Sequence, residues 1–527
     1  MSLQSVADGS SKTRRGWTAN RNVDVLIVPV TVAATCCFLV GLREEHFFFD
    51  EIFSATFSRQ SAFDVVISTL RFDIHPPLYY LQLKLWALPN SGDYWLFLNS
   101  VFWSVLAACS VVGLRFGAMP KVDGYIAGIL FAVMPATVLY SHSVRMYAME
   151  TCLTIWLAVA VGSAAGRISA RRPLIAVGVI ELALLYSNAG AFVIVLCAFS
   201  FGVFLLLERG ASKREYVRWL AVHAMCGFLA IPAVVNSALH SAAHPKIPTI
   251  WDVANTIVYL YAGPFSNNSA IYAATLVLFS ATLCFGLVTK SSRSLTAAFI
   301  VVPFVLVWSI SHLARPIWLE RVLIFTMPFF ATVLVSGVTE LLRRITTSAW
   351  SFQLCRVFIF AGFSLLWCAM RFADTGYFSK LTNYDAAAAI IARDLNPDDV
   401  IYVPENVSFW GIARYLVGPD WGSPLAIQDP TKPDFSGRWD SLLAKLGPTW
   451  RSRLHLEPKS RTIMVSGQPL VVGWSPPDQI DHARRVWVVT HETGQPDQTL
   501  PLLDGFFEVS HTSSPGLTVH LLARGAS

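Results

Sequence analysis

Long apolar runs alternate with short polar segments over the first 372 residues of the chain. A helix needs about 20 mostly apolar residues to cross the hydrocarbon core of a bilayer. By this measure the pattern predicts about eleven spans. The expected spans are Val25–Leu42, Tyr94–Phe116, Gly124–Tyr140, Met146–Ala165, Leu174–Ser187, Ala189–Leu207, Trp219–Leu239, Ile271–Thr289, Leu295–His312, Val322–Leu342 and Phe352–Met370. The sequence therefore predicts a polytopic α-helical membrane protein.

The pattern changes near residue 373, which divides the chain into a membrane domain (1–372) and a second domain (373–527). Pro, Asp, Gly and Trp become common there, and no apolar run is long enough to span. The alanine-rich segment YDAAAAIIARDL predicts a helix. Short strand-like runs follow, and they centre on Val400, Ile463, Val488 and Val519. Alternation of helix and strand suggests a small α/β domain.

Composition agrees with a membrane protein, because 54% of the 527 residues are hydrophobic and only 14% are charged. A soluble protein carries about 25% charged residues. The net charge of +6 is modest, and no basic cluster interleaves with aromatics, so nucleic acid is not an expected partner. All nine cysteines lie in apolar runs without a CxxC motif, which indicates small apolar fillers.

The Lys and Arg residues give an orientation for these spans. If the N-terminus is cytoplasmic, most basic residues fall in inner loops, as the positive-inside rule requires. These loops contain Arg115, Lys121, Arg167, Arg171, Arg172, Arg209, Lys213, Arg214, Arg218, Lys290, Arg293, Arg343, Arg344 and Arg356. An odd number of spans then places the C-terminal domain outside. The first apolar run lacks a small-residue cleavage site, so we interpret it as an uncleaved span.

The first outer loop, residues 43–93, is too apolar for a free loop and predicts amphipathic helices in the membrane interface. Its segment FFFDEIFSATF carries the adjacent acids Asp50 and Glu51. Neighbours on a helix point about 100° apart, so one acid would face a site and the other a partner or solvent. Further on, the proline after His75 favours extended backbone, which sets Asp73 and His75 on one side. A short helix from Leu78 to Leu88 is expected next.

Few other charges lie at the outer ends of the spans, the main ones being Arg145, Arg315, Arg321 and Lys246. Charges at span ends are costly unless hydrated or paired, and are often functional. Two acids with several arginines could hold an anionic phosphate beside a proton acceptor. Taken singly, the acids could be solvated loop residues and the arginines could be snorkelling anchors. Their joint occurrence on one side favours a site.

Four motifs in this order resemble the GT-C membrane glycosyltransferases, specifically the family 39-like branch that includes protein O-mannosyltransferases and the lipid A aminoarabinose transferase. The motifs are FFFDEIFSATF, FDIHPPLYYLQLKLW, YSHSVRMYAME and ERVLIFTMP. The resemblance covers the whole membrane domain, and the C-terminal domain looks like the exterior α/β domain of some bacterial members. The chain departs from the family at Val322, where a tyrosine is common, and at Asn188, where a histidine is frequent.

The resemblance implies roles for the outer residues. Asp50 would be the catalytic base, with Glu51 beside it. The donor phosphate would bind Arg145, Arg321 or Arg315, and Arg145 is favoured because His142 and Ser143 adjoin it. The expected substrate and loop residues are Asp73, His75, Tyr79, Tyr147 and Asn188. No cofactor is required, although Asp50, Asp73 and His75 could bind a divalent metal.

The implied activity is an inverting transfer of a monosaccharide from a polyprenyl-phosphate donor to a hydroxyl of an extracytoplasmic acceptor. Lipid A, lipopolysaccharide core or another envelope glycan is the favoured acceptor, and protein Ser/Thr stays open. The expected location is a bacterial inner membrane, with the C-terminal domain periplasmic or extracellular. One alternative is a lipid or sugar transporter, which needs ionisable residues within spans, such as Glu181 and His223. Another is a metal-dependent oligosaccharyltransferase. No role follows for Glu181.

Overall fold

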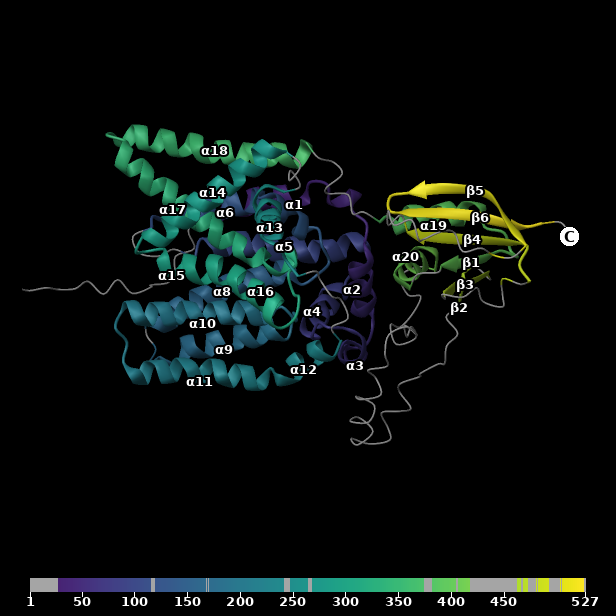
Figure 1. The fold of residues 1–527 in the computed structure, drawn as a ribbon, viewed down its shortest axis with the longest axis horizontal. Coiled ribbons are helices and arrows are strands. Elements are labelled where there is room, and N and C mark those ends of the chain that lie inside the picture. The colour runs from purple at the N-terminus through teal and green to yellow at the C-terminus, as the bar shows by residue number, and fades with distance from the viewer. Residues whose placement is uncertain are drawn as a thin grey trace, which may run out of the picture.

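The computed structural model of the chain describes residues 27–114, 119–166, 168, 170–240, 247–263, 268–373, 382–403, 406–417, 462–465, 468–472, 480, 482–491, 503 and 505–525. A helical body is followed by a smaller domain that contains a sheet (Figure 1). The body is built from the apolar runs, and the sheet from the later residues.

The first half of the body contains ten α-helices. They are α1 (Ile27–Leu39), α2 (Phe49–Arg59), α3 (Ala62–Phe72), α4 (Leu78–Ala87), α5 (Asp93–Val111), α6 (Lys121–Val133), α7 (Pro135–Ser141), α8 (Tyr147–Gly166), α9 (Arg171–Leu185) and α10 (Ala191–Glu208). A short 3₁₀ turn, η1 (Leu42–Glu44), follows α1. Caps set some boundaries: Ser61 accepts a hydrogen bond from the Asp64 N–H at the start of α3.

The second half of the body contains eight more α-helices in its described residues. They are α11 (Lys213–Leu229), α12 (Ile231–His240), α13 (Ile250–Ala262), α14 (Ser269–Val288), α15 (Arg293–Thr296), α16 (Val302–Leu313), α17 (Met327–Ile345) and α18 (Ala349–Ala373). The π-helical segment η3 (Ala297–Val301) joins α15 to α16. The 3₁₀ turns η4 (Glu320–Val322) and η5 (Ile324–Thr326) precede α17.

The helices confirm the predicted polytopic fold. Within the described residues, eight are long and apolar enough to cross a membrane, or up to ten if each of two bent pairs counts as one span. The bent pairs are α6 with α7 and α11 with α12, and each corresponds to one run in the sequence. The eleventh expected span is α9, whose 15 residues are fewer than a perpendicular crossing needs.

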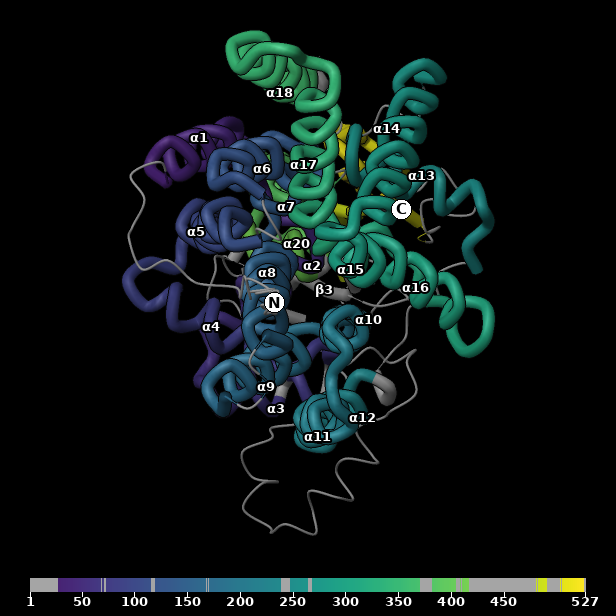
Figure 2. Tube along the Cα trace, turned by 90° about the vertical axis from the view of Figure 1, so that its left-hand side faces the viewer, coloured from purple at the N-terminus to yellow at the C-terminus, as the bar shows by residue number. Residues whose placement is uncertain are grey.

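The body is a bundle in which α8 is the most enclosed of the described spans. Figure 2 looks along the bundle and shows α8 among α5, α7, α9 and α10. In contrast, α1, α14 and α18 leave most of their surface uncovered, as expected for helices that face lipid. Close helix contacts need small residues, and a Cβ added to Gly286 of α14 would meet Thr296 at 2.4 Å.

The loop predicted to be amphipathic contains α2, α3 and α4, which lie at the end of the body that faces the C-terminal domain (Figure 1). The short helix expected from Leu78 is α4, and Pro77 is its N-cap. The N–H of Leu78 donates to the carbonyl of Tyr186, which ties this helix to the end of α9. These three helices place the predicted acids above the bundle.

The C-terminal domain holds a six-stranded sheet in the order β2-β3-β1-β4-β6-β5. The strands are β1 (Val400–Val403), β2 (Thr462–Val465), β3 (Gln468–Val472), β4 (Arg485–His491), β5 (Phe506–Ser514) and β6 (Leu517–Arg524). The central strand β1 runs parallel to β3 and β4, and the other pairs are antiparallel. Two helices, α19 (Tyr384–Asp394) and α20 (Asn406–Val417), flank β1 in sequence. All four expected strands and the alanine-rich helix are present, whereas β3, β5 and α20 were not predicted.

Candidate active site

The two adjacent acids of α2 have different surroundings. Glu51 is completely buried and accepts hydrogen bonds from the Phe48 N–H (3.1 Å) and the Val144 N–H (2.9 Å). It therefore caps α2 and holds that helix against the loop between α7 and α8. Asp50 points elsewhere, as the 100° step along a helix requires, and its side chain is 27% exposed. Glu51 is thus the partner-facing acid and Asp50 the accessible one.

Arg145, just before α8, lies inside the protein and is only 5% exposed. Its Nη1 donates to the Asp50 carbonyl oxygen (3.2 Å), the Ser54 hydroxyl (3.2 Å) and the Tyr80 hydroxyl (3.1 Å). One guanidinium therefore links α2 to α4. A side chain engaged in this way holds the site together and has little surface for a ligand.

Asp73 and His75 are connected to this guanidinium through Tyr80. Tyr80 donates its hydroxyl hydrogen to Asp73, and the N–H of His75 donates to the other Asp73 oxygen at 3.1 Å. Burial raises the pKa of Asp73 despite the opposing effect of Arg145. Burial also lowers the pKa of His75 well below its usual range, and the charges of Arg145 and Arg321 act in the same direction. His75 is therefore neutral at pH 7.

Arg321 is the accessible cation of the site. Its Nη1 lies 3.4 Å from the Asp50 carboxylate, and its side chain is 40% exposed. The residue lies in the 3₁₀ turn η4, which follows a loop and precedes the span of α17. An exposed guanidinium beside an exposed carboxylate combines an anion binder with a proton acceptor.

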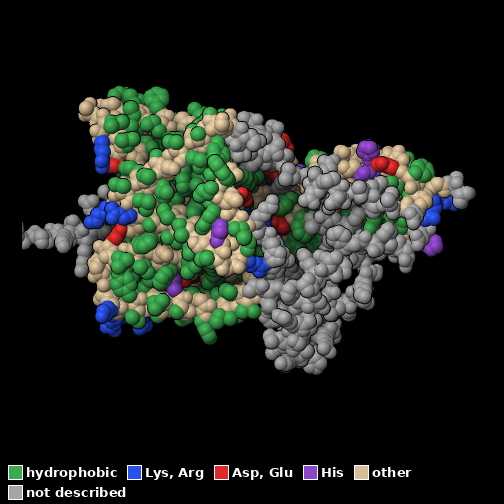
Figure 3. Space-filling view, viewed as in Figure 1, with side chains coloured by type: hydrophobic (Ala, Val, Ile, Leu, Met, Phe, Trp, Pro, Cys, Tyr) green, Lys and Arg blue, Asp and Glu red, His purple; other side chains and the backbone are tan. Residues whose placement is uncertain are grey.

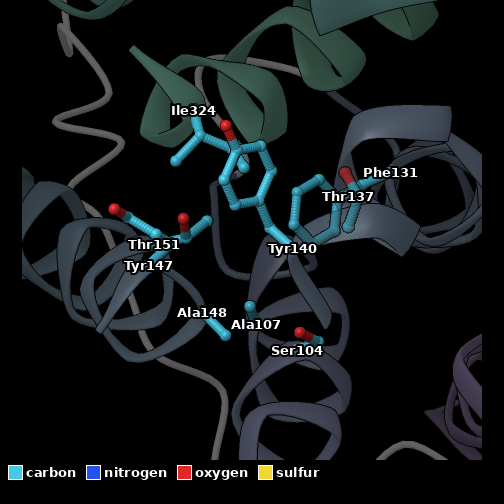
Figure 4. Close-up of a pocket in the computed structure, with 9 residues that line it drawn as sticks. All are labelled: Ser104, Ala107, Phe131, Thr137, Tyr140, Tyr147, Ala148, Thr151 and Ile324. Carbon is cyan, nitrogen blue, oxygen red and sulfur yellow. The ribbon is translucent and has the colours of Figure 1, made fainter. Parts of the chain in front are cut away.

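A small pocket lies in the bundle among α5, α6, α7, α8 and η5. Figure 4 shows Tyr140, Tyr147, Thr151 and Ile324 among the residues that line it. The ring centroids of the two tyrosines are 5.1 Å apart in an edge-on arrangement. Tyr147 is also within electrostatic reach of Arg321 and Asp50. The predicted substrate residue Tyr147 thus lines this pocket and lies near the accessible charges.

Further polar contacts connect His75 with residues of the bundle. The Nδ1 of His75 accepts from the Ala189 N–H at 3.4 Å, and the neighbouring Asn188 is buried. The Asn188 amide donates to Glu150 of α8 at 2.6 Å. Asn188 is a position at which the sequence departs from the resemblance to the GT-C enzymes, where a histidine is frequent. The buried Glu150 was not predicted, because in the sequence it is a single polar residue within an apolar span.

The structure also shows the surroundings of the other predicted residues. Tyr79 was expected near substrate, but it is fully buried, and the neighbouring Tyr80 makes the polar contacts instead. His142 was expected to share a phosphate, but its ring nitrogens lie 3.1 Å from Glu45 and 2.8 Å from the Phe38 carbonyl. Arg315 is half-buried just after α16. Lys246 lies outside the described residues.

A metal site built from Asp50, Asp73 and His75 does not fit this geometry. Asp73 already receives hydrogen bonds on both oxygens. The described part of the chain also has no group of three His, Cys, Asp or Glu side chains that could hold a metal ion. We therefore derive no step of the chemistry through a metal.

A helical membrane body, a pair of acids on the short helix α2 between the first two spans, and a C-terminal α/β domain are the features of the GT-C fold. ArnT from Cupriavidus metallidurans in the apo state shares this architecture, with a TM-score of 0.56, 12% identity and coverage of 94% of this chain and 97% of that one. The same protein bound to undecaprenyl phosphate gives 0.54 with the same identity and coverage.

The oligosaccharyltransferase of Archaeoglobus fulgidus, tethered with an acceptor peptide containing the NVT sequon, has a TM-score of 0.51 and 11% identity. The match covers 88% of this chain and 68% of that one. Identities this low establish a shared fold alone. No family model matches the chain, and no curated protein matches it.

Proposed function

We propose that this chain is an inverting membrane glycosyltransferase that uses a polyprenyl-phosphate-linked monosaccharide. The observation that carries the proposal is the Asp50–Arg321 pair, an accessible carboxylate 3.4 Å from an accessible guanidinium at the edge of a membrane bundle. Support comes from the shared fold with ArnT, which was solved with undecaprenyl phosphate. The apolar bundle offers the surface that a polyprenyl tail needs.

In the proposed reaction, an acceptor hydroxyl oxygen attacks the anomeric carbon of the donor sugar. The bond from that carbon to the phosphate oxygen breaks, and the lipid phosphate leaves with the electron pair. Asp50 takes the hydroxyl proton, and Arg321 stabilises the charge that develops on the phosphate. Attack from the side opposite the leaving group inverts the anomeric centre. Arg145, Tyr80 and Ser54 hold α2 in place for this step.

The choice between arginines reverses the preference drawn from sequence. Arg145 is enclosed by three protein acceptors, whereas Arg321 has surface to offer a ligand. We therefore assign the donor phosphate to Arg321 first.

We further propose that the site faces the exterior of a bacterial inner membrane, with the N-terminus cytoplasmic. In support, basic side chains gather at the end of the bundle far from the C-terminal domain (Figure 3). The favoured acceptor is lipid A, lipopolysaccharide core or another envelope glycan.

The test uses purified protein in nanodiscs with undecaprenyl-phosphate sugars, and mass spectrometry of lipid A, core sugars and secreted proteins from cells with and without the gene. We expect Asp50→Asn to lower transfer by about 10²-fold or more, because the base is lost. Glu51→Gln is the matched control, since Glu51 caps a helix and should affect stability more than chemistry. Near wild-type turnover by a folded Asp50→Asn variant would refute the assignment.

A further inference from the structure

Helix α20 of the C-terminal domain lies against the end of the body that carries α2 (Figure 1). This helix is not a distant part of an appended domain. Three of its side chains, Trp410, Arg414 and Tyr415, make specific contacts with the outer helices. Each contact leads toward the first turn of α2, where Asp50 lies.

Arg414 makes the charged contact. It is only 2% exposed, and it forms an ion pair with Asp93, the first residue of α5. Its guanidinium also lies 4.8 Å from the centroid of the Phe47 ring. The Phe47 ring in turn packs against the ring of Phe97, with 4.8 Å between the ring centroids. Arg414 thus fixes the segment that immediately precedes α2 by charge and by cation–π contact.

Tyr415 makes a second contact with the same segment. Its hydroxyl donates to the Asp93 carboxylate at 3.2 Å and accepts from the backbone N–H of Phe47 at 3.3 Å. Phe47 precedes Asp50 by three residues. A hydroxyl that accepts from this N–H fixes the position at which the chain enters α2.

Trp410 contacts α2 itself, through Phe53. Its ring lies 5.6 Å from that of Phe53, which in turn packs on Phe57 at 4.3 Å. Phe57 meets the ring of Tyr80 edge-on at 5.0 Å. Tyr80 accepts from Arg145, so the packing from α20 continues into the hydrogen bonds around Asp50.

We propose that Trp410, Arg414 and Tyr415 position the first turn of α2, so that the C-terminal domain sets the orientation of Asp50 during transfer. The proposal rests on the proposed role of Asp50 as the base. These three are positioning residues, since none of their described contacts reaches the Asp50 carboxylate itself. A merely appended domain would have no need to contact both the entry and the apolar face of one short helix.

The first test is hydrogen exchange on the full-length protein in nanodiscs. Tyr415→Phe removes one hydroxyl and leaves the ring, so we expect exchange at residues 47–57 to rise on the order of five-fold, the effect of one hydrogen bond. Arg414→Ala should give a larger rise there, while β1 and β4 stay protected. Arg485→Ala is the control, because it removes an arginine–aspartate pair within the sheet. Unchanged exchange at 47–57 in Tyr415→Phe and Arg414→Ala would overturn the proposal, as would an equal rise in Arg485→Ala.

The second test is the rate of transfer. Positioning predicts that Arg414→Ala lowers kcat about tenfold with the donor KM unchanged, and that adding Asp93→Ala costs little more, because both act through one pair. A raised KM with normal kcat would instead overturn it. If the wild-type protein transfers no sugar from any polyprenyl phosphate, the proposed function fails, and the exchange measurement still decides whether α20 fixes α2.

Discussion

The two arginines near Asp50 give opposite predictions, although both lie just before a membrane-spanning helix. Replacing Arg145 leaves three acceptors, on Asp50, Ser54 and Tyr80, without their donor. Each lost hydrogen bond to a charged group costs about 1.5–3 kcal/mol. We therefore expect Arg145→Ala to lose roughly 3 kcal/mol or more of folding stability, from the sum of three such costs.

Arg321 should behave differently, because its side chain is 40% exposed and water can replace its contacts. Hydrogen bonds to a charged group contribute about 1.5–3 kcal/mol, so Arg321→Ala should weaken donor binding by about 10- to 100-fold with little loss of stability. Arg321→Lys keeps the charge but loses the planar fork, and we expect an intermediate effect.

The assay compares both arginines under one set of conditions. Thermal unfolding in detergent reports stability, and titration of undecaprenyl phosphate by native mass spectrometry reports lipid binding. We expect Arg321→Ala to lose lipid binding but keep its stability. We expect Arg145→Ala mainly to lose stability. If Arg321→Lys and Arg321→Ala both bind as wild type does, Arg321 is an interfacial anchor and the reasoning from exposure is wrong.

Three further predictions follow from the packing and from one pKa. The pKa of His75 in the folded protein lies below its usual 6.5, so at acidic pH the folded state binds fewer protons than the unfolded state. The free energy of unfolding therefore falls as the pH drops below about 6.5. Between pH 7 and 5, wild type should lose stability relative to His75→Asn by at most about 1.4 kcal/mol per pH unit in thermal melts. Gly411→Ala should destabilise the C-terminal domain, because the new Cβ would lie 2.2 Å from the Tyr384 ring, whereas Gly362→Ala, which meets nothing within 4 Å, should be neutral in the same melts. A reporter fused to the C-terminus should be active outside the cytoplasm, and activity confined to the cytoplasm would contradict the proposed orientation.

The spans and the outer acids could be predicted because hydropathy and short motifs are local in sequence. Helix geometry also predicts that Asp50 and Glu51 face different surroundings, whereas the structure shows which of the two is accessible. The burial of Arg145 could not be predicted, since it depends on α2 and α4 packing against the loop before α8. The contacts of Tyr80 with Asp73 and Arg145 could not be predicted either, because only the packing of α4 decides which of the two neighbouring tyrosines faces Asp73.

Strands β3 and β5 were missed for a different reason. β3 (Gln468–Val472) is five residues long and includes a proline, and β5 (Phe506–Ser514) is an edge strand with polar residues over much of its length. The apolar run of β3, Leu470–Val472, is only three residues long and follows the proline directly. Helix α20 was missed because its contacts with α2 and α5 join residues more than 300 positions apart.

The pair of Glu181 and His223 bears on the transport alternative. From sequence, these residues were the main argument for ions within the membrane. In the structure, the His223 Nδ1 lies 2.7 Å from the Glu181 Oε1, and both side chains are buried between α9 and α11. Trp219 packs on His223 with ring centroids 4.3 Å apart. Each ionisable group thus has a partner at ion-pair distance on the neighbouring helix, although neither side chain forms a hydrogen bond within the described residues. The accessible charges lie instead at Asp50 and Arg321, which favours chemistry at the membrane edge over passage through the bundle.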